Sequence, residues 1–224
     1  MSLPTPYYSD DAVTIYHGDC LDIIDVLEFD VVVTDPPYGR SWSQGDTGSA
    51  RGWRTDSHAG IIGDASTAAR DAAMASWGES TPAAVFGDFM IPAPPTTKQV
   101  LVFDKGGDAG FTGACAGFRR NAEAIYLMGK LSSGLGGRSS VISSVVSCGG
   151  NLARTTGHPH TKPADVVRLL CESVGGGMIL DPFMGSGTTL RAAKDLGRKA
   201  IGIEIDERYC EIAARRMGQE VLDL

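Results

Sequence analysis

The sequence has no apolar run that approaches the length of about 18 residues required by a membrane-spanning helix. Its N-terminal segment, Met-Ser-Leu-Pro-Thr-Pro, lacks the basic stretch and apolar core of a signal peptide, so none is expected. These absences predict a cytoplasmic protein without a membrane partner. The length of 224 residues and the hydrophobic content of 42% are typical of one globular domain, and we assign residues 1–224 to it.

Cysteine is scarce, with five residues that are scattered, odd in number and free of any Cys-x-x-Cys pair. A disulfide framework is therefore not expected. Cys148, His158 and His160 are an alternative metal site, but a structural zinc site is normally closed by four ligands and the fourth is missing here. We predict that the protein holds no metal.

Basic residues are outnumbered overall, and the formal net charge is −7. The charge is unevenly distributed, since residues 1–104 hold 5 Lys and Arg against 15 Asp and Glu, whereas residues 105–163 hold 7 against 2. A local basic surface is sufficient for contact with a nucleic-acid backbone, whatever the global sign. The alternative interpretation of the same residues is an ordinary solvated surface.

The segment that dominates the sequence is Asp-Val-Val-Val-Thr-Asp-Pro-Pro-Tyr at residues 30–38. Three consecutive β-branched residues predict a buried parallel strand. Pro36 and Pro37 end it, because neither has an N–H group to donate to a neighbouring strand. Asp35 and Tyr38 are therefore expected at the carboxyl edge of the sheet, where α/β proteins bind ligands.

This arrangement is suited to chemistry on an exocyclic amino group of a nucleic-acid base. The nitrogen lone pair is delocalised into the ring, and hydrogen bonds to the Asp35 carboxylate and the Pro36 carbonyl would draw it out of conjugation. The Tyr38 ring could stack on a base that has been flipped out of the duplex. The alternative is a strand that ends in an Asp-Pro turn with a core tyrosine.

A second motif occupies residues 178–189, Met-Ile-Leu-Asp-Pro-Phe-Met-Gly-Ser-Gly-Thr-Thr. It predicts a strand, a glycine turn that allows close approach of a ligand, and a helix from about residue 190. Residues 200–206 predict another strand, whose Glu204 would accept hydrogen bonds from a ribose. A nicotinamide site is an alternative, but the third glycine of that fingerprint is absent. Asp181 also disfavours a pyrophosphate, which favours a ligand carrying a ribose, an amine and a sulfonium.

Together, Asp35–Tyr38 and Asp181–Thr189 resemble the motifs of S-adenosylmethionine-dependent amino DNA methyltransferases. The catalytic motif precedes the cofactor motif, as in the β group of that family. The resemblance extends to residues 18–20, 100–105, 124–130, 158–163 and 202–206, and so covers most of the chain. It implies S-adenosylmethionine as cofactor, double-stranded DNA as partner and a seven-stranded, Rossmann-like methyltransferase sheet.

The resemblance also implies the reaction, which is methyl transfer to an exocyclic base nitrogen. Adenine N6 is preferred, because an aspartate at the position of Asp35 is more typical of the adenine enzymes, while cytosine N4 stays open. Carbon-5 methylation is disfavoured by the lack of a Pro-Cys nucleophile motif. RNA methylation and a non-catalytic S-adenosylmethionine-binding or DNA-binding module are the alternatives. A homodimer and a cognate restriction enzyme are open as further partners.

Site residues follow from the resemblance, position by position. The catalytic residues are Asp35, Pro36, Pro37 and Tyr38. Asp19 is expected at the adenine amino group of the cofactor, Lys162 at its methionine carboxylate and Glu204 at its ribose. The full set of expected cofactor-binding residues is Asp19, Cys20, Lys162, Asp181, Phe183, Gly185, Ser186, Gly187, Thr188 and Glu204.

Two segments are expected to contact DNA. Residues 39–60 form a long loop in which arginines alternate with two tryptophans, a composition suited to stacking and phosphate contact. Its alternative is a mobile surface loop. Residues 131–157 separate a catalytic half (1–130) from a cofactor-binding half (158–224), and 13 of these 27 residues are Ser or Gly. Serine- and glycine-rich residues 131–157 offer few side chains that could read base edges, which predicts a short or relaxed DNA target sequence. The expected DNA-binding residues are Arg40, Arg51, Arg54, Arg138 and Arg154.

The remaining pattern predicts strands that alternate with helices. Further strands are expected at residues 13–16, 100–103, 124–128 and 141–146. Helices are expected at 21–27, from about 64–66 to 77, at 166–174 and at 207–217, and the proline-rich residues 82–97 are expected to be irregular. Such alternation predicts an α/β protein with a mostly parallel sheet that is covered on both faces.

Overall fold

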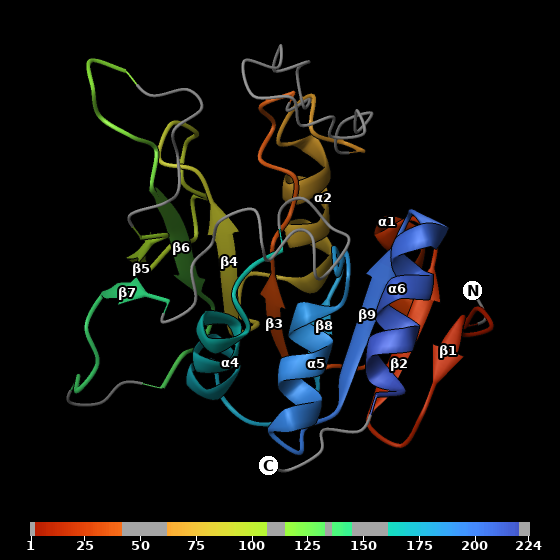
Figure 1. Cartoon of the computed structure of the whole chain (residues 1–224). Coiled ribbons are helices and arrows are strands. Elements are labelled where there is room, and N and C mark those ends of the chain that lie inside the picture. The colour runs from red at the N-terminus through yellow and green to blue at the C-terminus, as the bar shows by residue number, and fades with distance from the viewer. Residues whose placement is uncertain (1–2, 42–61, 107–114, 133–135, 145–160, 220–224) are drawn as a thin grey trace, which may run out of the picture.

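The computed structural model describes residues 3–41, 62–106, 115–132, 136–144 and 161–219. Within these ranges, nine strands form one sheet in the order β1-β2-β9-β8-β3-β4-β6-β5-β7 (Figure 1). The strands are β1 (Tyr8–Ser9), β2 (Val13–His17), β3 (Val31–Thr34), β4 (Ala83–Gly87), β5 (Gln99–Asp104), β6 (Ala122–Met128), β7 (Val141–Ser143), β8 (Ile179–Asp181) and β9 (Ala200–Glu204). The helices are α1 (Cys20–Ile23), the 3-10 helix η1 (Ile24–Val26), α2 (Ala68–Trp77), α4 (Ala164–Ser173), α5 (Thr188–Asp195) and α6 (Glu207–Met217).

The sheet is mostly parallel, as the sequence predicts. β6 is antiparallel to β4 and β5, and β1 is antiparallel to β2. The expected number of seven strands is exceeded by the two edge strands β1 and β7, which contain only two and three residues. Residues 8–9 were expected in a polar turn, because so short a segment has no hydrophobic period from which a strand is predicted.

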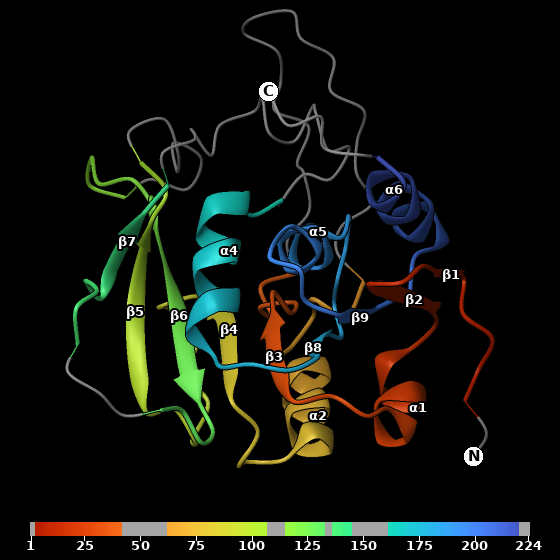
Figure 2. The same cartoon turned by 90° about the horizontal axis from the view of Figure 1, so that it is seen from below.

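Helices cover both faces of the sheet (Figure 2). α4, α5 and α6 lie on one face, and α1, η1 and α2 lie on the other. The central strand β3 contributes to both cores because successive side chains of a strand point to opposite faces. Val31 and Val33 pack with the first group of helices, Val32 packs with the second, and all three are buried.

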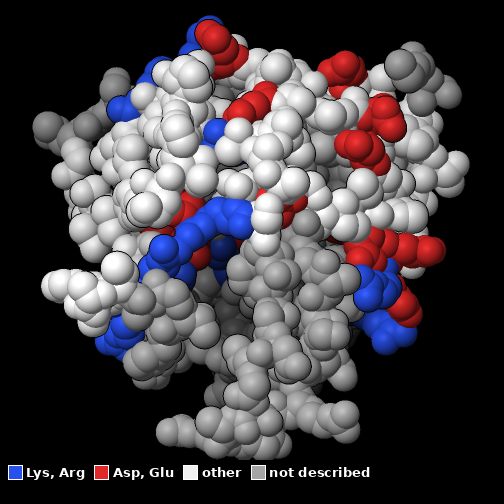
Figure 3. Space-filling view, turned by 90° about the horizontal axis from the view of Figure 1, so that it is seen from above, with Lys and Arg blue, Asp and Glu red and all other residues white. Residues whose placement is uncertain are grey.

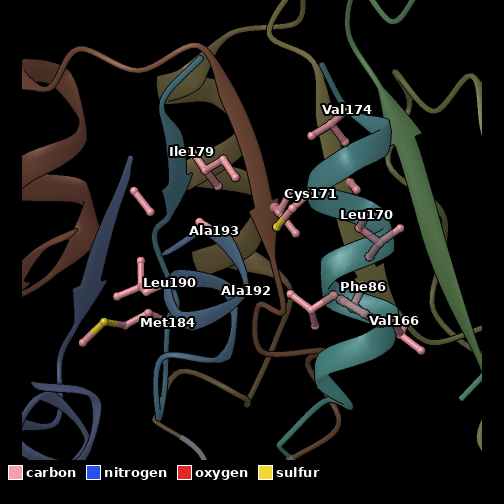
Figure 4. Close-up of a cluster of buried hydrophobic side chains, with 14 of the residues drawn as sticks. Phe86, Val166, Leu170, Cys171, Val174, Ile179, Met184, Leu190, Ala192 and Ala193 are labelled. Atoms are coloured by element: carbon pink, nitrogen blue, oxygen red, sulfur yellow. The ribbon is translucent and has the colours of Figure 1, made fainter. Parts of the chain in front are cut away.

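The larger core is apolar throughout and contains the cluster shown in Figure 4. Val166 and Leu170 of α4 lie beside Phe86 of β4, and Leu190 of α5 lies beside Met184 on the other side of the cluster. α4 and α5 are therefore held against β3 and β8, and the loops that lead into these helices lie at one edge of the sheet.

One expectation about local structure is wrong. Residues 82–97 were expected to be irregular, but β4 occupies residues 83–87 and is buried along its whole length. The run Ala-Ala-Val-Phe-Gly follows Pro82 directly, and a proline is compatible with the position just before a strand. β4 pairs with β3 on one side and β6 on the other, so tertiary pairing stabilises a strand whose proline-rich surroundings favour a loop.

Other elements differ from the prediction in their extent. Of the strand expected at residues 141–146, β7 forms residues 141–143, and residues 145–146 lie outside the described ranges. The helix expected at residues 21–27 is divided into α1 and η1. The helix expected to be capped by Asp64 or Ser66 begins at Ala68, and Thr67 at its N-cap makes no side-chain capping bond. The prediction of a helix at residues 207–217 is confirmed as α6, for which Asp206 supplies the cap by accepting a bond from the Arg208 N–H.

Gly129, which follows β6, provides a test of this packing. Its φ is +73°, and an added Cβ atom would lie 1.9 Å from the Thr81 carbonyl oxygen. We expect Gly129→Ala to lower the free energy of unfolding by at least about 2 kcal/mol, because a left-handed residue and a backbone clash are combined. Gly176→Ala is the matched control, since its Cβ would meet nothing within 4 Å. Urea unfolding of both variants measures the difference, and equal midpoints would contradict this packing.

Candidate active site

A cleft of about 1230 Å³ opens over the carboxyl ends of the central strands. β3, β8 and β9 are parallel neighbours, so the residues that follow them meet at one edge of the sheet. The cleft is lined by residues of both sequence motifs and of the turn before α1. The predicted catalytic and cofactor-binding residues among them are Asp19, Cys20, Asp35, Pro36, Pro37, Tyr38, Lys162, Asp181, Phe183, Gly185, Ser186, Thr188 and Glu204.

Asp35, directly after β3, lies in a compact polar network. Its Oδ1 accepts a hydrogen bond of 2.7 Å from the Tyr38 hydroxyl, and its Oδ2 lies 2.9 Å from the Lys162 Nζ. The same Nζ lies 3.0 Å from the Tyr38 hydroxyl oxygen, to which it donates. The Asp35–Tyr38 tetrapeptide is thus held in place by a lysine that comes from a segment far along the chain.

Glu123, on β6, completes this network. Its Oε2 lies 3.0 Å from the Lys162 Nζ, and its Oε1 accepts a hydrogen bond of 3.0 Å from Lys105. Against the effect of burial, these two ammonium groups lower the pKa of Glu123 to about 2. Burial raises the pKa of Asp35, an effect that Lys162 opposes. Two carboxylates and two ammonium groups therefore alternate at the base of the cleft.

Asp181, at the end of β8, is buried with an exposed fraction of 3%. Its Oδ1 accepts hydrogen bonds of 2.7 Å from the Thr34 hydroxyl and 3.2 Å from the Phe183 N–H. Burial raises its pKa to about 6, although hydrogen bonds from Thr189 and Thr34 act in the opposite direction. Asp181 thus joins the end of β3 to the turn that precedes α5.

Glu204, at the end of β9, bridges two backbone segments. Its Oε2 accepts a bond of 2.9 Å from the Gly185 N–H, and its Oε1 accepts one of 2.8 Å from the Asp206 N–H. A carboxylate oxygen has a second lone pair, so both oxygens retain acceptor capacity. Asp19 lines the cleft beside it and accepts a bond of 3.0 Å from the Leu21 N–H as the cap of α1.

The glycine turn before α5 is supported from the rear by α6. Arg216 donates a hydrogen bond of 2.6 Å to the Ser186 carbonyl oxygen and also approaches the hydroxyls of Ser186 and Thr188. Gly187 has φ +80°, and an added Cβ would lie 2.9 Å from the Ala213 Cβ. Gly187 does not line the cleft, so its observed role is close packing of the turn against α6. The expected close approach to a ligand stays a prediction for this glycine.

The expected DNA-binding arginines are only partly brought together. Arg40 lines the cleft and pairs with Asp88. Arg138 does not line it. Its guanidinium contacts Ser173 and Glu172 at the last turn of α4, at the edge of the sheet opposite Asp35. Arg51, Arg54 and Arg154 lie outside the described residues.

Other basic residues surround the mouth of the cleft. Lys105, Arg119 and Arg120 line it from the β5 and β6 side. Figure 3, which looks onto this face, shows Lys and Arg side chains beside acidic ones toward its middle. Just before the two arginines, Cys115 and Phe118 exchange backbone hydrogen bonds of 3.0 and 2.8 Å, and the Phe118 side chain is 81% exposed. A tight hairpin therefore presents an aromatic ring and two cations beside the cleft.

Sequence reasoning missed Glu123, Lys105 and Arg216 as parts of this site. A weak signal existed for Glu123, because residues 105–163 contain seven basic residues and only two acidic ones, of which Glu123 is one. Its partners Lys105 and Lys162 lie 18 and 39 positions away, and only the folded sheet brings them together. Arg216 lies in a helix rich in charged residues, where it resembles any surface arginine.

A sheet of this order, with a cleft at the carboxyl ends of its central parallel strands, defines a doubly wound α/β protein of the Rossmann-like class. Two carboxylates, Asp35 and Glu204, lie on either side of a glycine turn in that cleft. The sequence matches the DNA methylase family over residues 93–215, more than half of its length, and the chain belongs to that family.

Known methyltransferases share shorter segments with the chain. A segment of 71 residues is 44% identical to the type II methyltransferase M.ScaI of Streptomyces caespitosus, and it covers 31% of this chain and 23% of that protein. A segment of 65 residues is 45% identical to the type II methyltransferase M2.DpnII of Streptococcus pneumoniae, covering 28% of this chain and 24% of that protein. The matches thus span about a quarter of the length of these curated relatives.

Solved structures share the fold. The crystal structure of M1.HpyAVI in complex with S-adenosylmethionine has a TM-score of 0.66 and 20% identity, over 92% of this chain and 100% of the other. The cytosine-N4-specific PvuII DNA methyltransferase has a TM-score of 0.63 and 14% identity, over 97% of this chain and 90% of the other. At such low identity these similarities establish the Rossmann-like methyltransferase fold.

Two further features bear on the class of site. Within the described ranges, no helix is long and apolar enough to cross a membrane. The same ranges contain no group of three or more His, Cys, Asp and Glu side chains that could hold a metal ion. The alternative metal site of Cys148, His158 and His160 lies outside them.

Asp181 gives the site a pH signature. The pKa of the Asp181 carboxyl is about 6 in the folded protein and about 4 in the unfolded chain, so the folded protein binds the carboxyl proton more tightly. The contribution of Asp181 to the free energy of unfolding therefore falls as pH rises from about 4 to about 6. We expect the stability of the wild type, relative to Asp181→Asn, to fall by up to about 3 kcal/mol across this range. Denaturant unfolding at several pH values measures it. Asp22→Asn, at an exposed position, is the control. If the difference in the free energy of unfolding between the wild type and Asp181→Asn does not change with pH, the raised pKa assigned to Asp181 is wrong.

Proposed function

We propose that this protein transfers a methyl group from S-adenosylmethionine to the exocyclic amino group of a base in double-stranded DNA. One observation carries the proposal, namely that Asp35 of the catalytic tetrapeptide and Glu204 of the cofactor half line one cleft. A nucleophile and a methyl donor need to meet in line, and holding both in one cleft supplies a large part of the acceleration.

The cofactor half of the cleft is suited to S-adenosylmethionine. Glu204 retains acceptor capacity toward ribose hydroxyls, and Asp19 lies beside it to accept from an adenine amino group. The buried Asp181 disfavours a phosphate in the same turn, whereas a ligand without phosphates is compatible with it. When bound, this cofactor supplies an electrophilic methyl group on a sulfonium.

Asp35 is the residue that acts on the target amino group. The Tyr38 hydroxyl and Lys162 each occupy one of its oxygens, and each oxygen can accept a second hydrogen bond. Positive charge that develops on the attacked nitrogen would be stabilised by this carboxylate and by the Pro36 carbonyl. Lys162 is turned toward Asp35 and Glu123, so the contact with the cofactor carboxylate expected from the resemblance stays a prediction.

Adenine N6 is the proposed target, because an aspartate opens the tetrapeptide. Cytosine N4 is the second candidate, and the structural likeness to a cytosine-N4-specific enzyme is a reason to test it. Duplex DNA is the proposed partner, supported by Arg40, Arg119 and Arg120 at the mouth of the cleft. The exposed ring of Phe118 is suited to contact with an unstacked base.

Two substitutions separate the roles of the carboxylates. We expect Asp35→Ala to abolish methyl transfer while leaving S-adenosylmethionine affinity nearly unchanged, because Asp35 acts on the base. Glu204→Ala should weaken that affinity by about 1.5–3 kcal/mol, the scale of a hydrogen bond to a charged group. Isothermal titration with the cofactor and tritiated methyl transfer to duplex DNA measure both effects. Retained activity in Asp35→Ala would refute the catalytic assignment.

The identity and length of the target form a separate prediction. Phosphate contacts position a protein on DNA, but several side chains at base edges are needed to read sequence. Since residues 131–157 offer few such groups, we expect a target of about two to four base pairs with methylated adenine. Mass analysis of the modified nucleoside and single-molecule sequencing of methylated DNA measure both properties. A strict target of six or more pairs would place the recognition element elsewhere, and methylation of RNA alone would favour the RNA alternative.

A further inference from the structure

Glu123 belongs to neither sequence motif, yet its carboxylate is among the least accessible charged groups of the cleft. Its side chain is 15% exposed, and it approaches Lys162, Lys105 and the Tyr38 hydroxyl. β6 is antiparallel to β4, so its beginning lies at the edge where β3 and β4 end. Glu123, near the start of β6, therefore lies at the same edge of the sheet as Asp35, although β4 separates β6 from β3.

We infer that Glu123 is a positioning residue of the methyl-transfer site. Glu123 binds Lys162 together with Asp35, and its negative charge balances the positive charge beside the target nitrogen. This inference rests on the proposed function and deepens it. Neither the family match nor the sequence motifs assign a role to Glu123.

The geometry around Lys162 shows what Glu123 does. The ammonium has three protons and three acceptors, with Asp35 Oδ2 at 2.9 Å, Glu123 Oε2 at 3.0 Å and the Tyr38 hydroxyl oxygen at 3.0 Å. Its direction is therefore fixed, and through it the orientation of the Tyr38 ring and of the Asp35 carboxylate is fixed. Without Glu123, one proton of Lys162 loses its acceptor and the direction of the ammonium is no longer fixed by three contacts.

Charge gives Glu123 a second effect. Asp35 and Glu123 together balance Lys105 and Lys162, whose ammonium groups lie 3.0 Å from the two oxygens of Glu123. If Glu123 is replaced by a neutral residue, the four-residue cluster gains one net positive charge. The attacked nitrogen also becomes positive, so this excess charge would oppose the reaction in a cleft of low dielectric.

A double-mutant cycle tests this charge balance. Glu123→Gln should lower kcat by about 100-fold, the scale of losing one preorganised electrostatic contact, with KM for S-adenosylmethionine changed less than about threefold. Lys105→Met should lower kcat by less than about fivefold, because the ion pair that Lys105 makes within the described residues is with Glu123. The double variant is again neutral, and its kcat should exceed that of Glu123→Gln by at least about tenfold.

Two further variants exclude a general effect on structure. Glu172→Gln is the matched control, because Glu172 pairs with Arg168 and Arg138 away from the cleft, and its kcat should equal that of the wild type. If Glu123→Gln lowers the thermal unfolding midpoint, Glu123→Asp is used as the test variant in its place. Aspartate keeps the negative charge, but its side chain is shorter by one methylene group. The kcat of Glu123→Asp should still fall by about tenfold.

The outcomes distinguish this inference from the proposed function. An active wild type with Glu123→Gln within threefold of it would overturn the positioning role alone. A double variant as slow as Glu123→Gln would overturn the charge balance. Wild-type protein that binds S-adenosylmethionine but methylates no nucleic acid would overturn the proposed function and the inference with it.

Discussion

The hydrogen bond from the Thr34 hydroxyl to Asp181 joins two residues that lie 147 positions apart, and the rest of the site depends on the pairing that it accompanies. β3 and β8 are parallel, with Val32 opposite Leu180, so both strands end at the same edge. The Asp35–Tyr38 tetrapeptide and the glycine turn before α5 each follow one of these strands. A shift of one residue in this register would exchange the faces of β3, and Val31 and Val33 would enter the core that Val32 occupies. The packing of both cores therefore fixes how the segments after β3 and β8 lie relative to each other.

Around that pairing, the cleft is divided into two electrostatic environments. On the β9 side, Glu204 and Asp19 accept hydrogen bonds from backbone N–H groups and retain capacity for a polar, cationic ligand. On the β6 side, acidic and basic side chains alternate and neutralise each other around Lys162. A methyl donor that carries a sulfonium is suited to the first, and a neutral base that gains charge only during the reaction is suited to the second.

Much of the fold could be predicted because it depends on local patterns. The valine run of β3, the glycine turn before α5 and the helical period of α6 each specify their structure within a few residues. β4 could not be predicted, since its short apolar run lies among prolines and becomes a strand by pairing with β3 and β6. The edge strand β1 has only two residues and depends wholly on its partner β2.

The sequence by itself determined the strand-end residues of the site, because Asp35, Asp181 and Glu204 each follow an apolar run whose end is evident from the residues. The tertiary structure alone decided which side chains surround them. Glu123 and Lys105 come to Lys162 through the antiparallel placement of β6 beside β4 and β5, and Arg216 comes to the glycine turn through the packing of α6. Such contacts join residues that are distant along the chain, and no local period or motif encodes them, because pairing and packing of whole elements set their distances.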